Sequence, residues 1–315
     1  MNKALCSVVL CAICTGAMAK DFDMESALRA TYVNCVGIDE ALHDMKVKAG
    51  ISTAVTGVGT GLGIGATAVG IAKAQTDKTI EQKFKEMEIL ANSAVGSPQN
   101  EVSAEEFLAK VKELLNSNHV KESGAFNERQ KEKLNEIKPL NEKSKKLGNW
   151  RTGLLAGNTA TNIAGAAISG TNKVDKSLEK QIEDCRTAVK DLKKAIAQAK
   201  LNDEDVTEAE QIQSACSGFE YIDMSKINNR ATGGMSASIV GAGTGVVGTI
   251  VSALANSPNT RQGDAQKEKN LNAAANVLSA GSTVASATAT VFNATQIKAI
   301  KEVAEVAKKC TEVLK

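Results

Sequence analysis

The chain of 315 residues is poor in aromatic residues, which make up only 3%, and it contains only two histidines. Enzyme pockets are usually lined by apolar and aromatic side chains, so this scarcity speaks against an aromatic-lined active site. Two histidines also leave little material for metal binding or acid–base catalysis. Lysine and arginine number 38 against 36 acidic residues, so no overall charge excess favours nucleic acid or an anionic membrane.

Proline is rare as well, with three residues, and no segment alternates apolar and polar side chains like a convincing strand. Apolar residues instead recur at helical spacing along residues 22–48, 174–200 and the C-terminal segment from Ile297. Hydrophobic residues make up 43% of the chain, which suffices for a core dominated by Ala and Val. The sustained periodicity excludes general disorder and predicts an all-α protein.

The first 19 residues have the pattern of a secretory signal peptide. A lysine precedes a short apolar run, and the small residues Ala17-Met18-Ala19 fit a signal-peptidase site. The apolar run is shorter than the roughly 20 residues of a membrane span, which disfavours an N-terminal anchor. We therefore expect the mature chain to begin near Lys20 and to be exported to the periplasm, the cell envelope or the exterior.

Cleavage would remove three of the seven cysteines and leave Cys35, Cys185, Cys216 and Cys310. An even number of cysteines in an exported chain indicates disulfide bonds formed in an oxidising compartment. Four cysteines allow three pairings, and their spacing alone does not choose among them.

Four stretches of the mature chain carry no charged residue, and they suggest an internal duplication. The first and third align without gaps, so that Gly57 and Gly61 fall on Gly241 and Gly245. Each half then consists of a cysteine, an uncharged segment, a connection, a second uncharged segment and a cysteine. The four stretches lie between Lys48 and Lys73, Arg151 and Lys173, Arg230 and Arg261, and Lys269 and Lys298.

The duplication predicts two helical hairpin repeats, at residues 20–200 and 201–315. It favours the pairs Cys35–Cys185 and Cys216–Cys310, each of which would close the base of one hairpin. In the chain-entropy model such long loops contribute about 4–5 kcal/mol per bridge. The alternative is a Cys185–Cys216 bond across the linker between the repeats.

The first repeat carries a charged helical insertion at about residues 74–148. Within it, Gly96-Ser97-Pro98 is expected to end one helix, and Ser103 with Glu106 forms a capping box that begins the next. A third, heavily charged helix is expected to be interrupted by Pro139. Most of these charges are interpreted as solvated helix faces, and a surface for a protein partner is the alternative.

Small residues recur every four positions in the uncharged stretches, so they form stripes that allow two helix backbones to approach closely. The stripes resemble the glycine-zipper segments of bacterial envelope proteins, and this resemblance implies helix–helix association and membrane residence. It covers only the stripes and indicates a packing pattern rather than a family. The glycines expected to pack helices are Gly57, Gly61, Gly65, Gly153, Gly157, Gly165, Gly241 and Gly245.

The uncharged segments are long enough to cross a bilayer, at about 20 residues or more each. Their composition is less favourable, because Asn158, Asn162 and Asn293 interrupt them and strongly inserting residues are sparse. A water-soluble bundle and membrane-inserted hairpins both stay open. Trp150 lies at the edge of the second segment, where core packing is favoured over an interfacial anchor.

No motif for catalysis or cofactor binding has the structural context that it needs. Gly61-Leu-Gly63-Ile-Gly65-Ala matches a dinucleotide fingerprint by letters but follows no strand. His43 lies between acidic residues on an amphipathic helix, where a surface or half-buried histidine is expected. Asp203-Glu204-Asp205 is interpreted as a helix cap rather than a cation site.

These observations predict an exported, non-catalytic structural or interaction protein of the cell envelope or exterior. We expect it to associate with a protein partner or with itself, and to use no cofactor, metal ion, nucleic acid or small-molecule substrate. The alternative is a membrane-active or pore-forming protein whose glycine-rich hairpins insert into a bilayer.

Overall fold

A computed structural model describes residues 23–94, 128–263 and 265–315, and it shows helices joined by short connections, without a strand in these ranges. The prediction of an all-α fold is confirmed. The predicted signal peptide, the helix break at Gly96-Ser97-Pro98 and the capping box of Ser103 and Glu106 lie outside the described residues.

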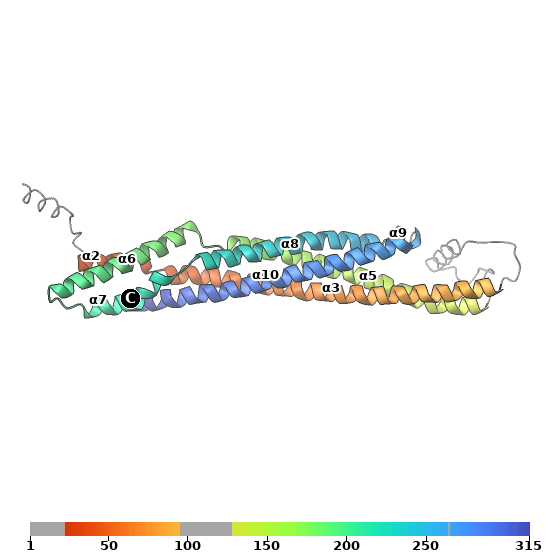
Figure 1. Ribbon diagram of the computed structural model, residues 1–315, viewed down its shortest axis with the longest axis horizontal. Coiled ribbons are helices and arrows are strands. Elements are labelled where there is room, and N and C mark those ends of the chain that lie inside the picture. The colour runs from red at the N-terminus through yellow and green to blue at the C-terminus, as the bar shows by residue number, and fades with distance from the viewer. Residues whose placement is uncertain (1–22, 95–127, 264) are drawn as a thin grey trace, which may run out of the picture. The chain divides into compact units, whose positions relative to one another are not determined.

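The described residues form two compact units. Unit 1 contains residues 23–46, 174–227 and 298–315, and unit 2 contains residues 47–94, 128–173 and 228–297. Both units draw on both predicted repeats, so the duplication stays a prediction. In chain order the helices are α2 (Met24–Cys35), α3 (Ile38–Ala94), α5 (Glu128–Thr171), α6 (Lys176–Leu201), α7 (Thr207–Cys216), the 3-10 helix η1 (Ser217–Tyr221), α8 (Ser225–Ala255), α9 (Pro258–Gly263) and α10 (Ala265–Leu314) (Figure 1).

Unit 1 joins α2, α6, α7 and η1 to the first turns of α3 and the last turns of α10. Helix α2 begins after Asp23, whose carboxylate accepts a hydrogen bond from the Ser26 amide at 3.1 Å. The chain then turns at Gly37, whose φ of +92° is readily adopted only by glycine. Helix α6 follows the predicted spacing, and its apolar face is buried at Leu178, Ile182, Cys185, Val189, Leu192 and Ile196.

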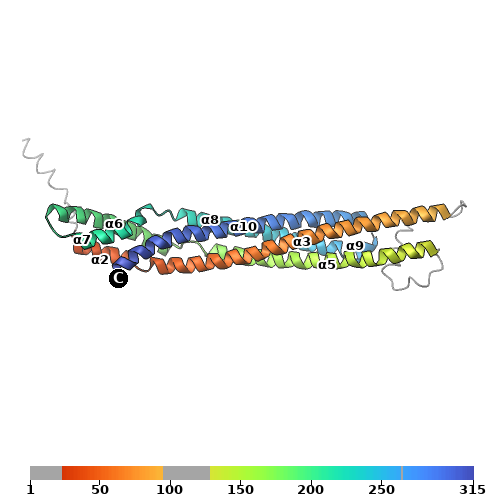
Figure 2. The same ribbon diagram turned by 90° about the horizontal axis from the view of Figure 1, so that it is seen from below.

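Unit 2 is built from four long helical segments of α3, α5, α8 and α10, which run alongside one another (Figures 1 and 2). Helices α3 and α5 are antiparallel, because Ser52 of α3 bonds Ser169 of α5 whereas Asp77, further along α3, bonds the earlier residue Ser144. Neither α3 nor α5 can bury one of its faces by itself, so the stability of each helix depends on packing against its neighbours.

The predicted insertion is a continuation of α3 and α5 rather than a separate element, as far as residues 74–94 and 128–148 show. The two helices stay paired there because Phe84 and Leu134 are buried and Lys133 bonds Glu86 at 3.0 Å. The predicted interruption at Pro139 is wrong, since α5 runs through it. Proline removes one amide donor, and these tertiary contacts on α5 offset that loss.

Candidate functional site: the polar core and apolar surface of unit 2

The interior of unit 2 contains many hydroxyl, amide and charged side chains beside alanines and larger apolar residues such as Met87, Ile137 and Leu155. Buried polar groups need hydrogen-bond partners, and most of these side chains find them on neighbouring helices. The buried polar set consists of Ser52, Thr56, Lys73, Thr76, Ser144, Arg151, Asn158, Thr159, Asn162, Ser169, Asn172, Ser238, Ser252, Thr260, Asn272, Ser279, Ser282, Ser286, Asn293 and Gln296.

A central cluster of two asparagines and two serines links α5, α8 and α10. Asn162 Nδ2 donates to Ser286 Oγ at 2.8 Å, and Asn158 Nδ2 donates to Ser282 Oγ at 2.9 Å. Ser282 Oγ in turn donates to the carbonyl oxygen of Gly241 at 2.8 Å. All four side chains are fully buried. The cluster therefore fixes the register of three helices through polar contacts alone.

A second cluster links α3, α5 and α10. Ser52 Oγ and Ser169 Oγ lie 2.8 Å apart, and Asn293 donates from Nδ2 to Ser52 Oγ at 2.9 Å. Ser169 Oγ donates to Asn293 Oδ1 at 3.0 Å, which closes a ring of three side chains. This ring ties α3 to the helices that the central cluster joins.

Arg151 is fully buried, and its guanidinium donates only to neutral oxygens of α8 and α10. Its Nε bonds Ser252 Oγ at 2.9 Å, and its two terminal nitrogens bond Asn276 Oδ1 at 2.9 Å and Asn272 Oδ1 at 2.8 Å. A buried charge is tolerated only when its donors are satisfied. Arg151 thus holds α5, α8 and α10 together at the point where the charge-free stretch of α5 begins.

Lys73 is the second fully buried cation of unit 2, and it ends the charge-free stretch of α3. Its Nζ lies 2.6 Å from Asp77 Oδ2 and 3.4 Å from Glu268 Oε1. Ser144 Oγ donates to the other oxygen of Asp77 at 2.5 Å. Removal of either carboxylate would leave a buried ammonium group poorly compensated.

The predicted packing glycines differ in what surrounds them. An added Cβ would meet nothing within 4 Å at Gly57, Gly61 or Gly153, which are exposed. At Gly65 it would make an ordinary contact with Leu154 at 3.5 Å. These four positions do not bring two backbones into close approach.

The other four predicted glycines, Gly157, Gly165, Gly241 and Gly245, lie against a neighbouring helix. A Cβ at Gly165 would lie 2.6 Å from Thr56 Cγ2, and one at Gly241 would lie 2.8 Å from Asn162 Oδ1. A Cβ at Gly245 would overlap Thr159 Oγ1. At Gly165, Gly241 and Gly245, side chains of the polar core therefore fill the space that the missing Cβ leaves free, and at Gly157 the neighbour is Leu62.

On α3 the contact face is formed by glycines that were not predicted to pack helices. A Cβ at Gly59 would lie 2.5 Å from Thr161 Oγ1, and one at Gly63 would lie 2.5 Å from Thr283 Oγ1. Gly70 faces Asn276 in the same way. Glycines stand at four-residue spacing on two faces of α3, so the spacing alone could not identify the buried one.

The outward faces of the same helices expose many large apolar side chains along the charge-free stretches. Exposed contiguous apolar surface is unusual on a soluble monomer and marks an interaction site. The exposed large hydrophobic residues lie on all four long helices of unit 2, in their charge-free stretches or directly beside them. They are Val47, Ile51, Val58, Ile64, Ile71, Ile163, Ile239, Val240, Val246, Val247, Ile250, Leu254, Val277, Val284 and Val291.

By length and composition, two helices of the described chain could cross a membrane. One candidate lies within residues 24–87, with a mean hydropathy of 1.5, and the other is α8, with 1.7. Only 28% of each apolar window is buried, whereas the core helix of a soluble protein is mostly buried.

In unit 1, the residues Cys35, Cys185, Cys216 and Cys310 are fully buried and lie in the pairs that the predicted duplication favoured. The sulfur atoms of Cys35 and Cys185 are 2.03 Å apart, and those of Cys216 and Cys310 are 1.99 Å apart. The alternative Cys185–Cys216 bond is therefore not formed. The first bond joins α2 to α6, and the second joins α7 to α10.

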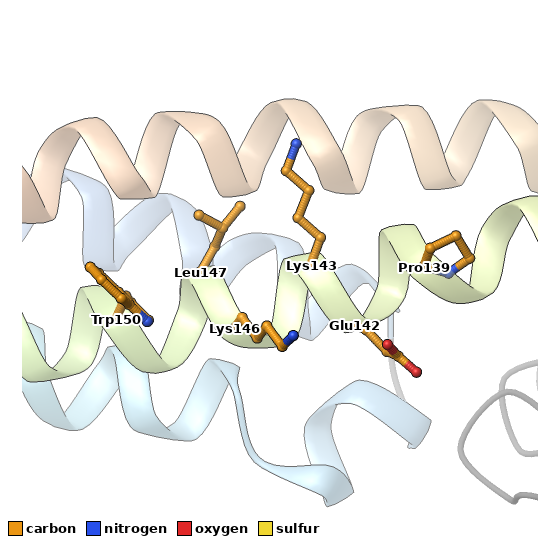
Figure 3. Close-up of a pocket in the computed structure, with 6 residues that line it drawn as sticks. All are labelled: Pro139, Glu142, Lys143, Lys146, Leu147 and Trp150. Carbon is orange, nitrogen blue, oxygen red and sulfur yellow. The ribbon is translucent and has the colours of Figure 1, made fainter.

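Trp150 is 69% exposed, so the prediction that it packs in the core is wrong. Its neighbour Arg151 occupies the inward position instead, and the indole is directed outward on α5. It borders a surface depression of about 470 Å³ with Leu147, Lys143, Lys146, Glu142 and Pro139 (Figure 3).

The described residues contain no group of three or more His, Cys, Asp or Glu side chains that could hold a metal ion. His43 is exposed on α3. The polar side chains of unit 2 bond mainly to one another across helices, an arrangement suited to holding helices together. No family model matches the chain, and no characterised protein or solved structure is similar to it.

Proposed function

We propose that the protein is an exported, non-catalytic protein of the cell envelope whose unit 2 is inserted in a lipid bilayer. The observation that carries this proposal is the inverted distribution of polarity in unit 2. Along the charge-free stretches its interior holds Ser, Thr and Asn side chains beside alanines and Leu155, with Lys73 and Arg151 at the ends, and its exposed large residues there are Val, Ile and Leu. This distribution suits hydrocarbon as the surrounding solvent.

The asparagines that lower the hydropathy of α5 and α10 support the proposal. Asn158 and Asn162 of α5 and Asn293 of α10 are fully buried and hydrogen-bonded within the bundle. Their amides would therefore not contact lipid. The surface that would contact lipid is more apolar than the sequence average of these helices.

The helix contacts have the chemistry of membrane bundles. Without a hydrophobic driving force in lipid, helices associate through small residues and through interhelical hydrogen bonds. Gly59, Gly63, Gly241 and Gly245 provide close contacts, and the serine and asparagine clusters provide the bonds. A soluble bundle would instead leave the apolar surface in water unless a partner covered it.

The two disulfides support placing unit 1 in an oxidising compartment. Unit 1 also has an ordinary aqueous polarity, with apolar residues such as Ile182 and Leu192 buried and charged residues of α6 exposed. We infer an envelope protein with a disulfide-bonded aqueous part and a membrane-inserted helical bundle that serves a structural role.

Fractionation of the oxidised protein, expressed with its N-terminal segment, tests the proposal. Membranes are washed with alkaline carbonate and then extracted with detergent. We expect the protein to stay in the washed membrane and to be released only by detergent. Recovery in the soluble fraction or in the carbonate wash would contradict membrane insertion.

A matched pair of cysteine variants locates the inserted surface. Val284→Cys on α10 and Val33→Cys on α2 replace valines that are 66% and 64% exposed. In intact membranes a water-soluble maleimide should label Val33→Cys rapidly, because unit 1 is aqueous, and should label Val284→Cys only after detergent is added. Equal labelling at both positions before detergent would contradict the proposal.

A further inference from the structure

We propose that Lys143, Lys146 and Trp150 of α5 form an interfacial anchor that binds anionic phospholipid headgroups. The inference rests on the proposed insertion of unit 2 and names the lipid that contacts one edge of it. These residues line the surface depression on α5, together with Leu147 (Figure 3).

The position of Trp150 is the first observation. It directly precedes Arg151, after which the chain carries no charge until Lys173, beyond the end of α5. The indole is 69% exposed although it is the largest apolar side chain of the protein. Tryptophan is enriched at the membrane–water boundary, where its ring stays among headgroups and its N–H stays hydrated.

The distribution of charge on the same helix face is the second observation. Residues 139, 143, 146, 147 and 150 follow helical spacing and therefore share one face of α5. Lys143 and Lys146 are exposed, and Glu142 is the acidic residue that borders them. Beyond Trp150 this face continues with exposed Gly153, Ala160 and Ala164, without charge.

The order along this face is thus basic, aromatic and then apolar, which matches the order of layers from an anionic headgroup region into hydrocarbon. Lysine side chains near the ends of inserted helices extend toward the phosphate groups. Basic residues close to a membrane surface are attracted by anionic lipids. This complementarity of charge, joined to the apolar surface of unit 2, selects a phospholipid as the occupant.

The protein contains a single tryptophan, so its fluorescence reports on this site alone. The full oxidised protein is reconstituted into phosphatidylcholine vesicles with or without phosphatidylglycerol. The lipids carry bromine, which quenches tryptophan, either near the glycerol backbone or near the chain ends. We expect stronger quenching by shallow than by deep bromine, and an increase in shallow quenching when phosphatidylglycerol is present.

The double variant Lys143→Gln/Lys146→Gln should lose most of the increase caused by phosphatidylglycerol and still insert. Lys190→Gln/Lys193→Gln, which removes two exposed lysines of α6 in unit 1, should keep it. Three results would overturn the anchor and leave the proposed function standing, provided that the protein inserts. They are stronger quenching by deep than by shallow bromine, no quenching by bromine, and an unchanged response to phosphatidylglycerol in Lys143→Gln/Lys146→Gln. Failure of the unaltered protein to insert into either vesicle would overturn both.

Discussion

At the scale of single residues, unit 2 is held by short side chains that meet across very close helices. Thr159 lies against Gly245, and Asn162 lies against Gly241, so each polar side chain occupies the space left by a missing Cβ. The same short side chains form interhelical hydrogen bonds, such as that from Asn162 to Ser286. Close approach and hydrogen bonding therefore depend on each other, and a single methyl group can disturb both.

Two glycines of α8, Gly245 and Gly243, differ in whether a neighbouring helix lies close to them, so they test the effect of the close contact. Gly245→Ala should destabilise unit 2 by about 1–3 kcal/mol, because the new methyl group overlaps Thr159 and lies 3.2 Å from Ser282 Oγ. Gly243→Ala meets nothing within 4 Å and should stabilise α8 by up to about 1 kcal/mol. Thermal unfolding in one detergent compares them. Equal effects of the two changes would show that the close contact at Gly245 is absent.

A double-mutant cycle tests the central cluster. Asn162→Ala and Ser286→Ala should each destabilise unit 2 by about 1–3 kcal/mol, since each leaves a buried polar partner unpaired. The double variant should cost less than the sum, by about 0.6 to 1.7 kcal/mol. Asn162→Ala combined with Thr288→Ala, an exposed residue of α10, should be additive. A coupling of zero between Asn162 and Ser286 would contradict their bond.

At the scale of elements, helix ends in unit 1 are fixed by aspartates. Asp205 Oδ1 accepts from the amide and the hydroxyl of Thr207 at 3.0 and 2.7 Å, at the start of α7. Asp223 makes the same pair of bonds with Ser225, at 3.0 and 2.6 Å, at the start of α8. Asp205 of the predicted capping turn thus bonds the first residue of α7, whereas the N-cap residue is Val206, which makes no side-chain cap bond. In both cases the pKa of the aspartate is lowered from its ordinary value of 3.8. The hydrogen bond from the hydroxyl is the larger cause, and the bond from the amide is the second.

This lowered pKa gives unit 1 an acid-sensitive contribution to stability. The folded state favours the Asp223 carboxylate, so the contribution is present above pH 3.8 and is lost as the pH falls below that value. Asp223→Ala should lower the unfolding midpoint of unit 1 at neutral pH, and its difference from the unaltered protein should shrink in acid. Asp184→Ala, at an exposed position of α6, is the control. A difference that is constant with pH would contradict the capping bond.

Helical periodicity predicted some elements better than others, for a physical reason. In α6 large apolar residues recur on one face, so Leu178, Ile182 and Leu192 could be assigned to the core in advance. In α3 small residues occupy every face, so periodicity could not distinguish Gly61, which is exposed, from Gly63, which is packed. Trp150 was misplaced because its neighbour Arg151 occupies the inward position of α5, so the helix directs the indole outward.

At the scale of the whole molecule, the described residues combine two units whose interiors differ in their share of polar side chains. Unit 1 buries Ile38, Leu42 and Phe219 around two disulfides, whereas unit 2 buries Arg151 and Asn162. The hypothesis of a duplication predicted the disulfide partners, because it paired the cysteines that would begin and end each half. It could not predict which side chains of the uncharged segments are inward.

Peptide mapping of the non-reduced protein checks the pairing directly. Proteolysis should yield one disulfide-linked peptide pair that contains Cys35 and Cys185 and another that contains Cys216 and Cys310. Treatment with a reductant before digestion should abolish both pairs. A peptide pair that joins Cys185 to Cys216 would contradict the structure of unit 1.

The positions of the two disulfides also determine how the chain would respond to cleavage. The covalent rings run from Cys35 to Cys185 and from Cys216 to Cys310, and they share no residue. One peptide-bond cut inside either ring leaves every part of the molecule covalently attached. One cut in the connection between α6 and α7, around Asp203, separates the rings into two pieces even under oxidising conditions. Among the described residues, this connection is the covalent link between two separately closed loops, and a protease acting there could release one loop from the other.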